Sequence, residues 1–178
     1  MNHTTIESIR KSIRNIADFP IHGIQIKDIT TAIKQPHLFK MIADEISGQF
    51  MNKNITKIVA IESRGFIMGG ALAYHLNAGF VPVRKPGKLP AEVLNVTYDL
   101  EYGTDTLEIH RDALSPDDVV LLHDDLLATG GTALATLNLI RQFGVKQIYA
   151  SFIIELDFLE GRKKIIPSCD VFSLVHFE

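Results

Sequence analysis

One short segment of the sequence combines two carboxylates with a run of small residues. In "DDVVLLHDDLLATGGT" (117–132), an apolar run ends in Asp124 and Asp125, and the chain then turns through two glycines. The backbone N–H groups of such a turn can converge on one point at the start of the next helix, which suits a phosphate. Because an ionised carboxylate only accepts hydrogen bonds, the two acids suit vicinal sugar hydroxyls. The segment therefore predicts a site for a ribose 5-phosphate.

Other phosphate-binding motifs do not fit this segment. A Walker A loop carries Lys and then Ser or Thr after its last glycine, whereas Thr132 and Ala133 follow Gly131. No G-x-G-x-x-G opens the turn. A capped strand–helix turn with solvated acids is the plainer alternative. The full order (strand, two acids, two apolar residues, one small residue, Thr-Gly-Gly-Thr) is more specific, and it resembles the phosphoribosyl pyrophosphate (PRPP) motif of type I phosphoribosyltransferases.

Strands and helices that alternate along the chain must position this segment. The spacing of isoleucines predicts a first amphipathic helix through residues 6–16, and that of Phe and Ile predicts a second through residues 39–50. Further helices are predicted from about Phe66, through 134–140 and near 157–164. Short apolar runs predict buried strands at 57–61 and 118–122, and further strands are predicted at 79–83, 147–154 and 171–175. Residues 91–110 predict two more strands.

This alternation predicts an α/β domain built around a mostly parallel, twisted sheet flanked by helices. In such a sheet, ligands bind at the carboxyl ends of the strands. Asp124 and Asp125 are expected at such an end, directly before a helix. The fold class and the candidate site are therefore consistent with each other.

The composition limits the classes of protein. The chain has 178 residues, of which 46% are hydrophobic, so residues 1–178 are expected to form a single domain with a buried core. A net charge of −3 argues against general nucleic-acid or membrane-surface binding. The longest stretch without Asp, Glu, Lys or Arg, 65–83, contains glycines and Pro82, and it does not suit a membrane span. The single cysteine, Cys169, excludes an intrachain disulfide and favours the cytoplasm.

Nearly the whole chain resembles one branch of the type I family, the adenine phosphoribosyltransferases. "DFPIHGIQIKDIT", "IESRGF", "RKPGKLP", "YDLEYGTDTLEIH" and "DDLLATGGT" occur in that family's order and at similar spacing. The resemblance implies that adenine and PRPP give AMP and pyrophosphate, with Mg²⁺, in purine salvage. It also implies a homodimer, an N-terminal helix and base-binding hood in residues 1–35, and a mobile lid loop in residues 85–107.

The same resemblance assigns residues that bind the phosphates. An Arg guanidinium binds phosphate oxygens bidentately and stays charged. Mg²⁺ would arrive with PRPP or be held by Asp124 and Asp125. The implied ribose-phosphate residues are Asp124, Asp125, Ala128, Thr129, Gly130, Gly131 and Thr132. The implied pyrophosphate residues are Ser63, Arg64, Arg84, Lys85 and Lys88, some of them acting across the dimer, and Arg64 is also a candidate catalytic residue.

Base choice depends on residues outside the motif. Related enzymes that act on hypoxanthine or guanine carry an acid immediately before Thr-Gly, where this chain has Ala128. The resemblance implies that Glu101 and Tyr102, on the lid, take the catalytic role instead. It also assigns Gln25, Lys27 and Leu126 to adenine. Gln25 and Lys27 replace a small aliphatic residue and Arg, and His22 replaces Pro, so this part of the resemblance depends on main-chain contacts.

His123 stands where the family has an aliphatic residue. It could tune Asp124, because imidazole titrates near ~6.5, or it could simply be hydrogen-bonded in place. Two other functions also remain open. The same fold could act on another base, such as xanthine or orotate, or it could serve a non-catalytic PRPP-sensing regulator. Residues 1–35 lack the length and charge of a DNA-binding module, which such a regulator usually carries.

Overall fold

The core of the protein is a parallel sheet of five strands in the order β4-β3-β7-β8-β9. The computed structural model describes residues 3–17, 25–99 and 103–178. The strands are mostly buried in the centre of the sheet, as expected of parallel strands, and partly exposed at its two edges. They are β3 (Lys57–Ile61), β4 (Gly79–Val83), β7 (Val119–Leu127), β8 (Gln147–Leu156) and β9 (Asp170–Phe177). The predicted α/β fold class is confirmed.

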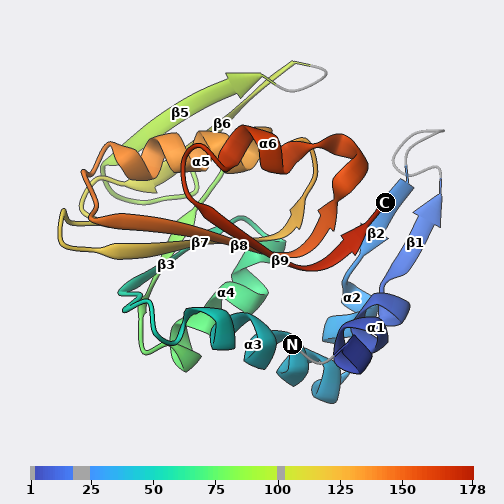
Figure 1. Ribbon diagram of the computed structural model, residues 1–178. Helices are drawn as coiled ribbons and strands as arrows, with labels where there is room; N and C mark the ends of the chain where they lie inside the picture. The colour runs from blue at the N-terminus through green and yellow to red at the C-terminus, as the bar shows by residue number, and fades with distance from the viewer. Residues whose placement is uncertain (1–2, 18–24, 100–102) are drawn as a thin grey trace.

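Helices cover both faces of this sheet, as Figure 1 shows. One face carries α1 (His3–Ser12), α2 (Thr30–Ile33), α3 (Pro36–Phe50) and α4 (Arg64–His75). The other carries α5 (Gly131–Arg141) and α6 (Gly161–Ile165), which follows the short 3₁₀ helix η1 (Asp157–Leu159). In the described part of the chain, no helix is long and apolar enough to cross a membrane.

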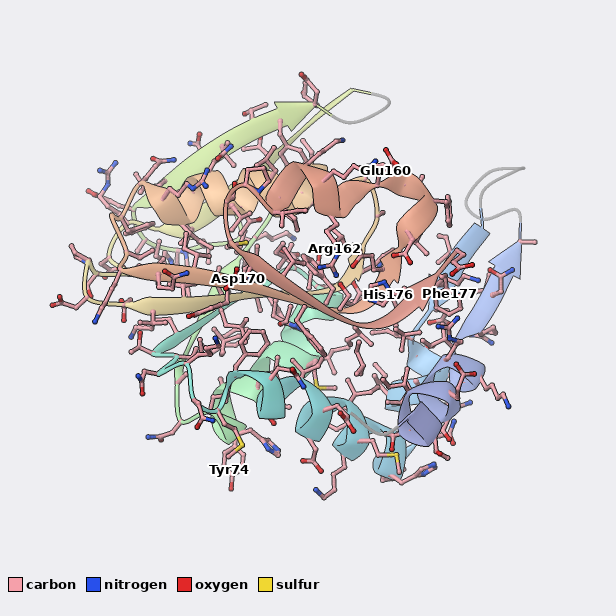
Figure 2. The ribbon with its side chains drawn as sticks, viewed as in Figure 1. Tyr74, Glu160, Arg162, Asp170, His176 and Phe177 are labelled. Carbon is pink, nitrogen blue, oxygen red and sulfur yellow. The ribbon has the colours of Figure 1, made fainter. Side chains whose placement is uncertain are left out.

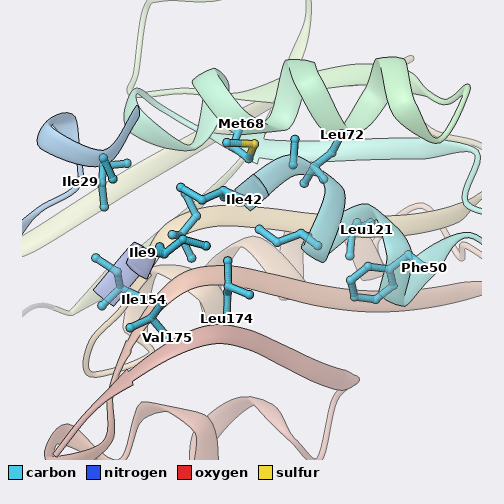
Figure 3. Close-up of a cluster of buried hydrophobic side chains, with 14 of the residues drawn as sticks. Ile9, Ile29, Ile42, Phe50, Met68, Leu72, Leu121, Ile154, Leu174 and Val175 are labelled. Carbon is cyan, nitrogen blue, oxygen red and sulfur yellow. The ribbon is translucent and has the colours of Figure 1, made fainter. Parts of the chain in front are cut away.

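Two hydrophobic cores lie on opposite faces of the sheet, because successive side chains of a strand point to opposite sides. On β7, Leu121 packs with the core beneath α3 and α4, and Leu122 packs with the core beneath α5. Both side chains are fully buried. Figure 3 shows the first core, where Ile42 of α3 and Met68 of α4 meet Leu174 and Val175 of β9. The N-terminal helix joins this core through Ile9.

The N-terminal segment differs from its prediction. The helix expected through residues 6–16 ends at Ser12, and β1 (Arg14–Ala17) pairs antiparallel with β2 (Gln25–Asp28). The side chain of Arg14 donates to Asp28 at 2.6 Å and lowers the pKa of that carboxyl to about 2, with help from Thr30. From Ile13 onward, the prediction of a helix from the isoleucine spacing was wrong, because residues 14–17 pair with β2 as a strand.

Other predicted elements are present, and some are longer than expected. The strand predicted at 118–122 continues as β7 to Leu127, so both carboxylates lie within a strand and not beyond its end. Within the expected lid loop, β5 (Val93–Asp99) and β6 (Thr104–His110) form an antiparallel hairpin, as the pattern of residues 91–110 predicted. The helix predicted from Phe66 begins two residues earlier, at Arg64.

Candidate active site

A cleft opens where the carboxyl ends of β3 and β7 meet the hairpin of β5 and β6. It has a volume of about 340 Å³ and adjoins a hollow of about 210 Å³ along the turn after β7. Arg64, Asp124, Asp125 and Thr132 line both spaces. The structure therefore brings residues from two distant segments, after β3 and after β7, to one continuous surface at the carboxyl edge of the sheet.

The two carboxylates in this cleft are held differently. Asp125 is buried, at 3% exposure, and accepts a hydrogen bond of 2.5 Å from Nε of Arg64. Asp124 Oδ1 accepts from the Asp125 amide at 2.9 Å. Burial first, and then the neighbouring Asp125, raise the pKa of Asp124 well above its usual range. The two carboxyl groups therefore differ: Asp125 is paired with a cation, whereas Asp124 favours its protonated form more than a free carboxyl does.

Arg64 connects the two halves of the cleft. Its side chain is half exposed, and with Nε on Asp125 the guanidinium is oriented by that carboxylate. Burial is the largest single influence and lowers the pKa of Arg64, but the charge and hydrogen bond of Asp125, together with the charges of Asp124 and Asp28, raise it overall, so the side chain is a fixed cation. The next residue, Gly65, lies so close to Asp124 that a Cβ there would be 2.9 Å from its carboxylate. A larger residue at position 65 would push Asp124 away.

The turn after β7 is a compact loop that opens α5. Gly130 has a φ of +80°, a left-handed conformation that glycine adopts without strain, whereas Gly131 does not need it. A Cβ on Gly131 would meet nothing nearer than 3.9 Å, where Tyr98 and Asp99 lie. Ala128, Thr129, Gly130, Gly131 and Thr132 all line the hollow. The residues that open this helix of eleven residues, whose first N–H groups lack partners within the helix, therefore line the hollow.

The basic residues after β4 are held mainly by acids. Arg84 Nε donates to Glu62 Oε2 at 3.0 Å, and the Lys85 amide donates to the same oxygen at 3.1 Å. Burial raises the pKa of Glu62, but these hydrogen bonds, together with the charges of Arg84 and Lys88, lower it overall. The Lys85 side chain lines the cleft and pairs with Asp105, whereas Lys88 is exposed. Arg84 thus fixes the loop of Glu62 and Ser63, whose mutual peptide bond is cis.

The hairpin contributes two residues that sequence reasoning missed. The Tyr98 hydroxyl lies 3.1 Å from the Thr132 hydroxyl and 3.3 Å from Asp105. Asp105 also pairs with Lys85, so the hairpin touches both the loop after β7 and the loop after β4. The sequence did offer one signal, since Val96 and Tyr98 on one strand and Leu107 on the next have the spacing of residues that face the core. That spacing does not show which residues they contact.

The expected adenine residues are less closely grouped. Leu126 lines the hollow, next to the loop after β7. Nζ of Lys27 lies 4.2 Å from the centre of the Phe177 ring, so this side chain packs on β9. Gln25 pairs through its backbone with Ala17. Glu101, Tyr102 and His22 lie outside the described residues.

His123 is a buried residue of β7 with a fixed position. Its Nδ1 lies 2.9 Å from the Ser151 hydroxyl on the neighbouring strand. Burial lowers the pKa of this imidazole to about 3, so the ring is neutral in the range where proteins function. The geometry favours the hydrogen-bonded alternative over a role in tuning Asp124 by titration.

Comparisons with known proteins agree on one family. A phosphoribosyl transferase domain matches residues 30–172. An adenine phosphoribosyltransferase of Phocaeicola vulgatus is 58% identical over 95% of this chain and 97% of the relative. The crystal structure of adenine phosphoribosyltransferase from Rhodothermus marinus matches with a TM-score of 0.94 and 49% identity, covering 99% of this chain and 100% of that one. That of APRTase from Giardia lamblia, complexed with 9-deazaadenine, matches with a TM-score of 0.93 and 42% identity, covering 97% and 98%.

These matches span both the sheet and every described segment that lines the cleft. The shared fold is that of the type I phosphoribosyltransferases, as the motif in the sequence indicated. The chain therefore belongs to the adenine phosphoribosyltransferase family.

Proposed function

We propose that this protein transfers the phosphoribosyl group of PRPP to adenine, giving AMP and pyrophosphate in purine salvage. The observation that carries the proposal is the cleft itself. It joins a loop rich in backbone N–H groups, a pair of acids and the cation Arg64 within one continuous space. A sugar that carries a phosphate at one end and a pyrophosphate at the other matches this order of groups.

Each part of the substrate has a partner of suitable chemistry. The 5′-phosphate fits the loop of Ala128 to Thr132, where helix-opening N–H groups favour an anion. Asp124 and Asp125 accept hydrogen bonds from the vicinal ribose hydroxyls. The pyrophosphate would lie toward Ser63, Arg64 and Lys85, and the loop of Arg84 and Lys88 completes that side. In this orientation, C1 of the ribose, which carries the pyrophosphate, would lie in the cleft on the side of Ser63 and Arg64.

In the reaction, the bond between ribose C1 and the pyrophosphate oxygen breaks, and a bond to an adenine nitrogen forms. Positive charge develops on the sugar ring, as in glycosyl transfers generally. The carboxylates beneath the ribose stabilise that charge, and Arg64 stabilises the negative charge on the leaving group. The adenine proton must then be accepted by a base, and Ala128 cannot supply one.

We assign that proton transfer to Glu101, with Tyr102 beside it, on a lid formed by residues 85–107. Residues 1–35 would form the hood over the base. Choice of adenine is supported by the family and by the 9-deazaadenine bound to the Giardia lamblia relative. Gln25 and Lys27 would contribute their main chain, which fits the packing of the Lys27 side chain on Phe177.

Mg²⁺ fits the donor set of this site. Mg²⁺ takes oxygen ligands, usually one or two carboxylates together with substrate phosphates. Asp124 and Asp125 offer such oxygens at the cleft, and both would hold the ion together with PRPP. When bound, it would supply charge neutralisation to the departing pyrophosphate.

We also propose a homodimer that uses the outer face of α4 and the edge strand β4. Ile67, Tyr74 and Phe80 there are 43%, 87% and 39% exposed, and large apolar side chains grouped on one surface mark an interface. Tyr74 projects from the molecule in Figure 2. We place the protein in the cytoplasm, because its single cysteine, Cys169, allows no intrachain disulfide and favours a reducing compartment.

The assay that tests the function compares bases. Protein, PRPP and Mg²⁺ are incubated with adenine, hypoxanthine, xanthine or orotate, and pyrophosphate release is measured. We expect product with adenine far above product with the other three. More product with another base would assign the fold to that base, and no product with any base, despite PRPP binding, would indicate a PRPP sensor.

Asp124→Asn is expected to weaken PRPP use and to stabilise the fold. Stranding a ribose hydroxyl costs about 1–3 kcal/mol in the closed site. Folding raises the pKa of Asp124, so the folded state holds its proton to higher pH than the unfolded chain, whose carboxyl titrates near ~3.9. Stability from this group therefore falls as pH rises above that value.

The measurement is KM for PRPP together with Tm at about pH 5 and about pH 8. The gain in Tm of Asp124→Asn over the wild type should be larger at the higher pH. Asp117→Asn, an exposed acid just before β7, is the matched control and should change neither quantity. An unchanged KM for PRPP in a folded Asp124→Asn protein would contradict the assignment.

Glu101→Gln is expected to bind PRPP normally and to transfer slowly. Loss of a general acid–base group typically costs about 10²–10⁴-fold in rate. Single-turnover formation of AMP measures the chemical step apart from product release. Glu92→Gln, an exposed acid just before β5, serves as the control. Transfer at the wild-type rate across the pH range would leave Glu101 without a catalytic role.

Tyr74→Asp is expected to convert the dimer to monomers, because it places a charge within the proposed apolar interface. Sedimentation velocity measures the molecular mass at several protein concentrations. Ile166→Asp is the control, since Ile166 is also exposed, at 53%, but follows α6 on the other face of the sheet. A Tyr74→Asp protein with the mass of the wild-type dimer would exclude this surface.

A further inference from the structure

The loop after β7 rests on the main chain of a second segment, at Gly161. A Cβ built on Gly161 would collide with the carbonyl oxygen of Ala128 and would lie 2.8 Å from the amide nitrogen of Gly130. From the other side, a Cβ on Gly130 would lie 2.6 Å from the carbonyl oxygen of Gly161. The two backbones are therefore in contact with no side chain between them.

The torsion angles of Gly161 do not explain this glycine. Gly161 is absent from the residues of positive φ, whereas Gly130 is among them at +80°. Gly161 opens α6, and alanine is a better helix former than glycine. Alanine would therefore suit position 161 in every respect except its contact with the loop.

The segment of Gly161 is held firmly to the sheet. Arg162 Nε donates to both carboxylate oxygens of Glu155, at 2.9 and 3.1 Å, and its terminal nitrogens reach the Val171 carbonyl at 2.9 Å and the Ser173 hydroxyl at 3.2 Å. Glu155 is buried, at 3% exposure, on β8, and the two acceptors after it belong to β9. One guanidinium thus ties α6 to two strands.

A second contact holds the other end of the same segment. His176 Nδ1 lies 2.9 Å from Asp157 Oδ1, which fastens η1 to β9. Figure 2 shows Arg162 and His176 near each other beside β9. Glu155, Asp157 and His176 are close enough to share a metal ion, but Arg162 already occupies both oxygens of Glu155. The cluster is therefore better explained as the attachment of residues 157–162.

We propose that Gly161 is a positioning residue for the phosphate loop. It touches no substrate. Its main chain, held by Arg162 and Glu155, supports Ala128 and Gly130 from behind, so that the N–H groups of residues 129–132 keep one fixed arrangement around the 5′-phosphate. This inference rests on the proposed function, because it takes that phosphate as the ligand of the loop.

Gly161→Ala tests the inference by separating two subsites. The added methyl group must displace Ala128 and Gly130, so Kd for ribose 5-phosphate should weaken by about tenfold or more, as expected for loss of a charge-assisted hydrogen bond. Pyrophosphate with Mg²⁺ binds at Ser63 and Arg64 and should keep its affinity. Isothermal titration calorimetry measures both constants. KM for PRPP should rise more than KM for adenine.

Gly48→Ala is the matched control, because Gly48 is also helical and a Cβ there would meet nothing within 4 Å. It should leave both constants unchanged. Arg162→Lys provides a second variant that keeps the positive charge but loses the fork on Glu155. It should reproduce the selective loss of ribose 5-phosphate binding, and it carries the test if Gly161→Ala does not fold.

Unchanged ribose 5-phosphate affinity in folded Gly161→Ala protein would overturn the inference. Equal weakening of ribose 5-phosphate and pyrophosphate would overturn it as well, since a general loss of structure affects both subsites. The proposed function and the role of Gly161 can each be contradicted without the other. AMP formation by the wild type tests the proposed function, and the ratio of ribose 5-phosphate affinities between variant and wild type tests the support by Gly161.

Discussion

The constraint on which this structure depends is the placement of two adjacent carboxylates at the edge of a buried sheet. Ionised acids are costly to bury unless they are paired or hydrogen-bonded. Asp125 is paired with Arg64, and Asp124 accepts from the backbone while its pKa is raised. The start of α4, which supplies the cation Arg64, must therefore lie against β7. This one requirement brings the two halves of the cleft together.

Close approach of backbones is the second requirement, and glycine meets it at three places. Gly65 leaves room for the Asp124 carboxylate, Gly130 takes a left-handed turn, and Gly161 lies directly behind that turn. Each contact joins segments that are far apart in the sequence. Rigid placement of this kind is what anion binding by main-chain N–H groups needs, because those groups cannot adjust by rotating a side chain.

Much of the fold could be predicted from the sequence, and the limits have physical reasons. "KIVAI" was recognisable as a buried strand because both faces of a central parallel strand are apolar. The helix expected through Ile16 ends at Ser12, because pairing of β1 with β2 is a long-range contact that periodicity does not record. The continuation of β7 to Leu127 depends on its pairing with β8, which is also a long-range contact. The charged residues after "VVLL" suggested that the strand had already ended.

The candidate site also has a part that the sequence predicted and a part that it did not. Asp124, Asp125 and the glycine loop were recognisable since the chemistry lies in one continuous motif. The contacts of Tyr98 with Thr132, of Arg84 with Glu62, and of Gly161 with Ala128 link separate motifs, and no local pattern encodes them. A glycine inside "DFLEGRKK" looks like an ordinary turn residue until its neighbour in space is known.

The packing around Phe177 affects how this protein is made. Arg10 of α1 and Lys27 of β2 both place their cations over the Phe177 ring, at 5.5 and 4.2 Å. Segments at opposite ends of the described sequence thus meet, and the central pairing of β3 with β7 already joins distant residues. High contact order of this kind slows folding. On the ribosome, Arg10 and Lys27 can reach Phe177 only after β9 has emerged, so the N-terminal segment takes its final place near the end of translation.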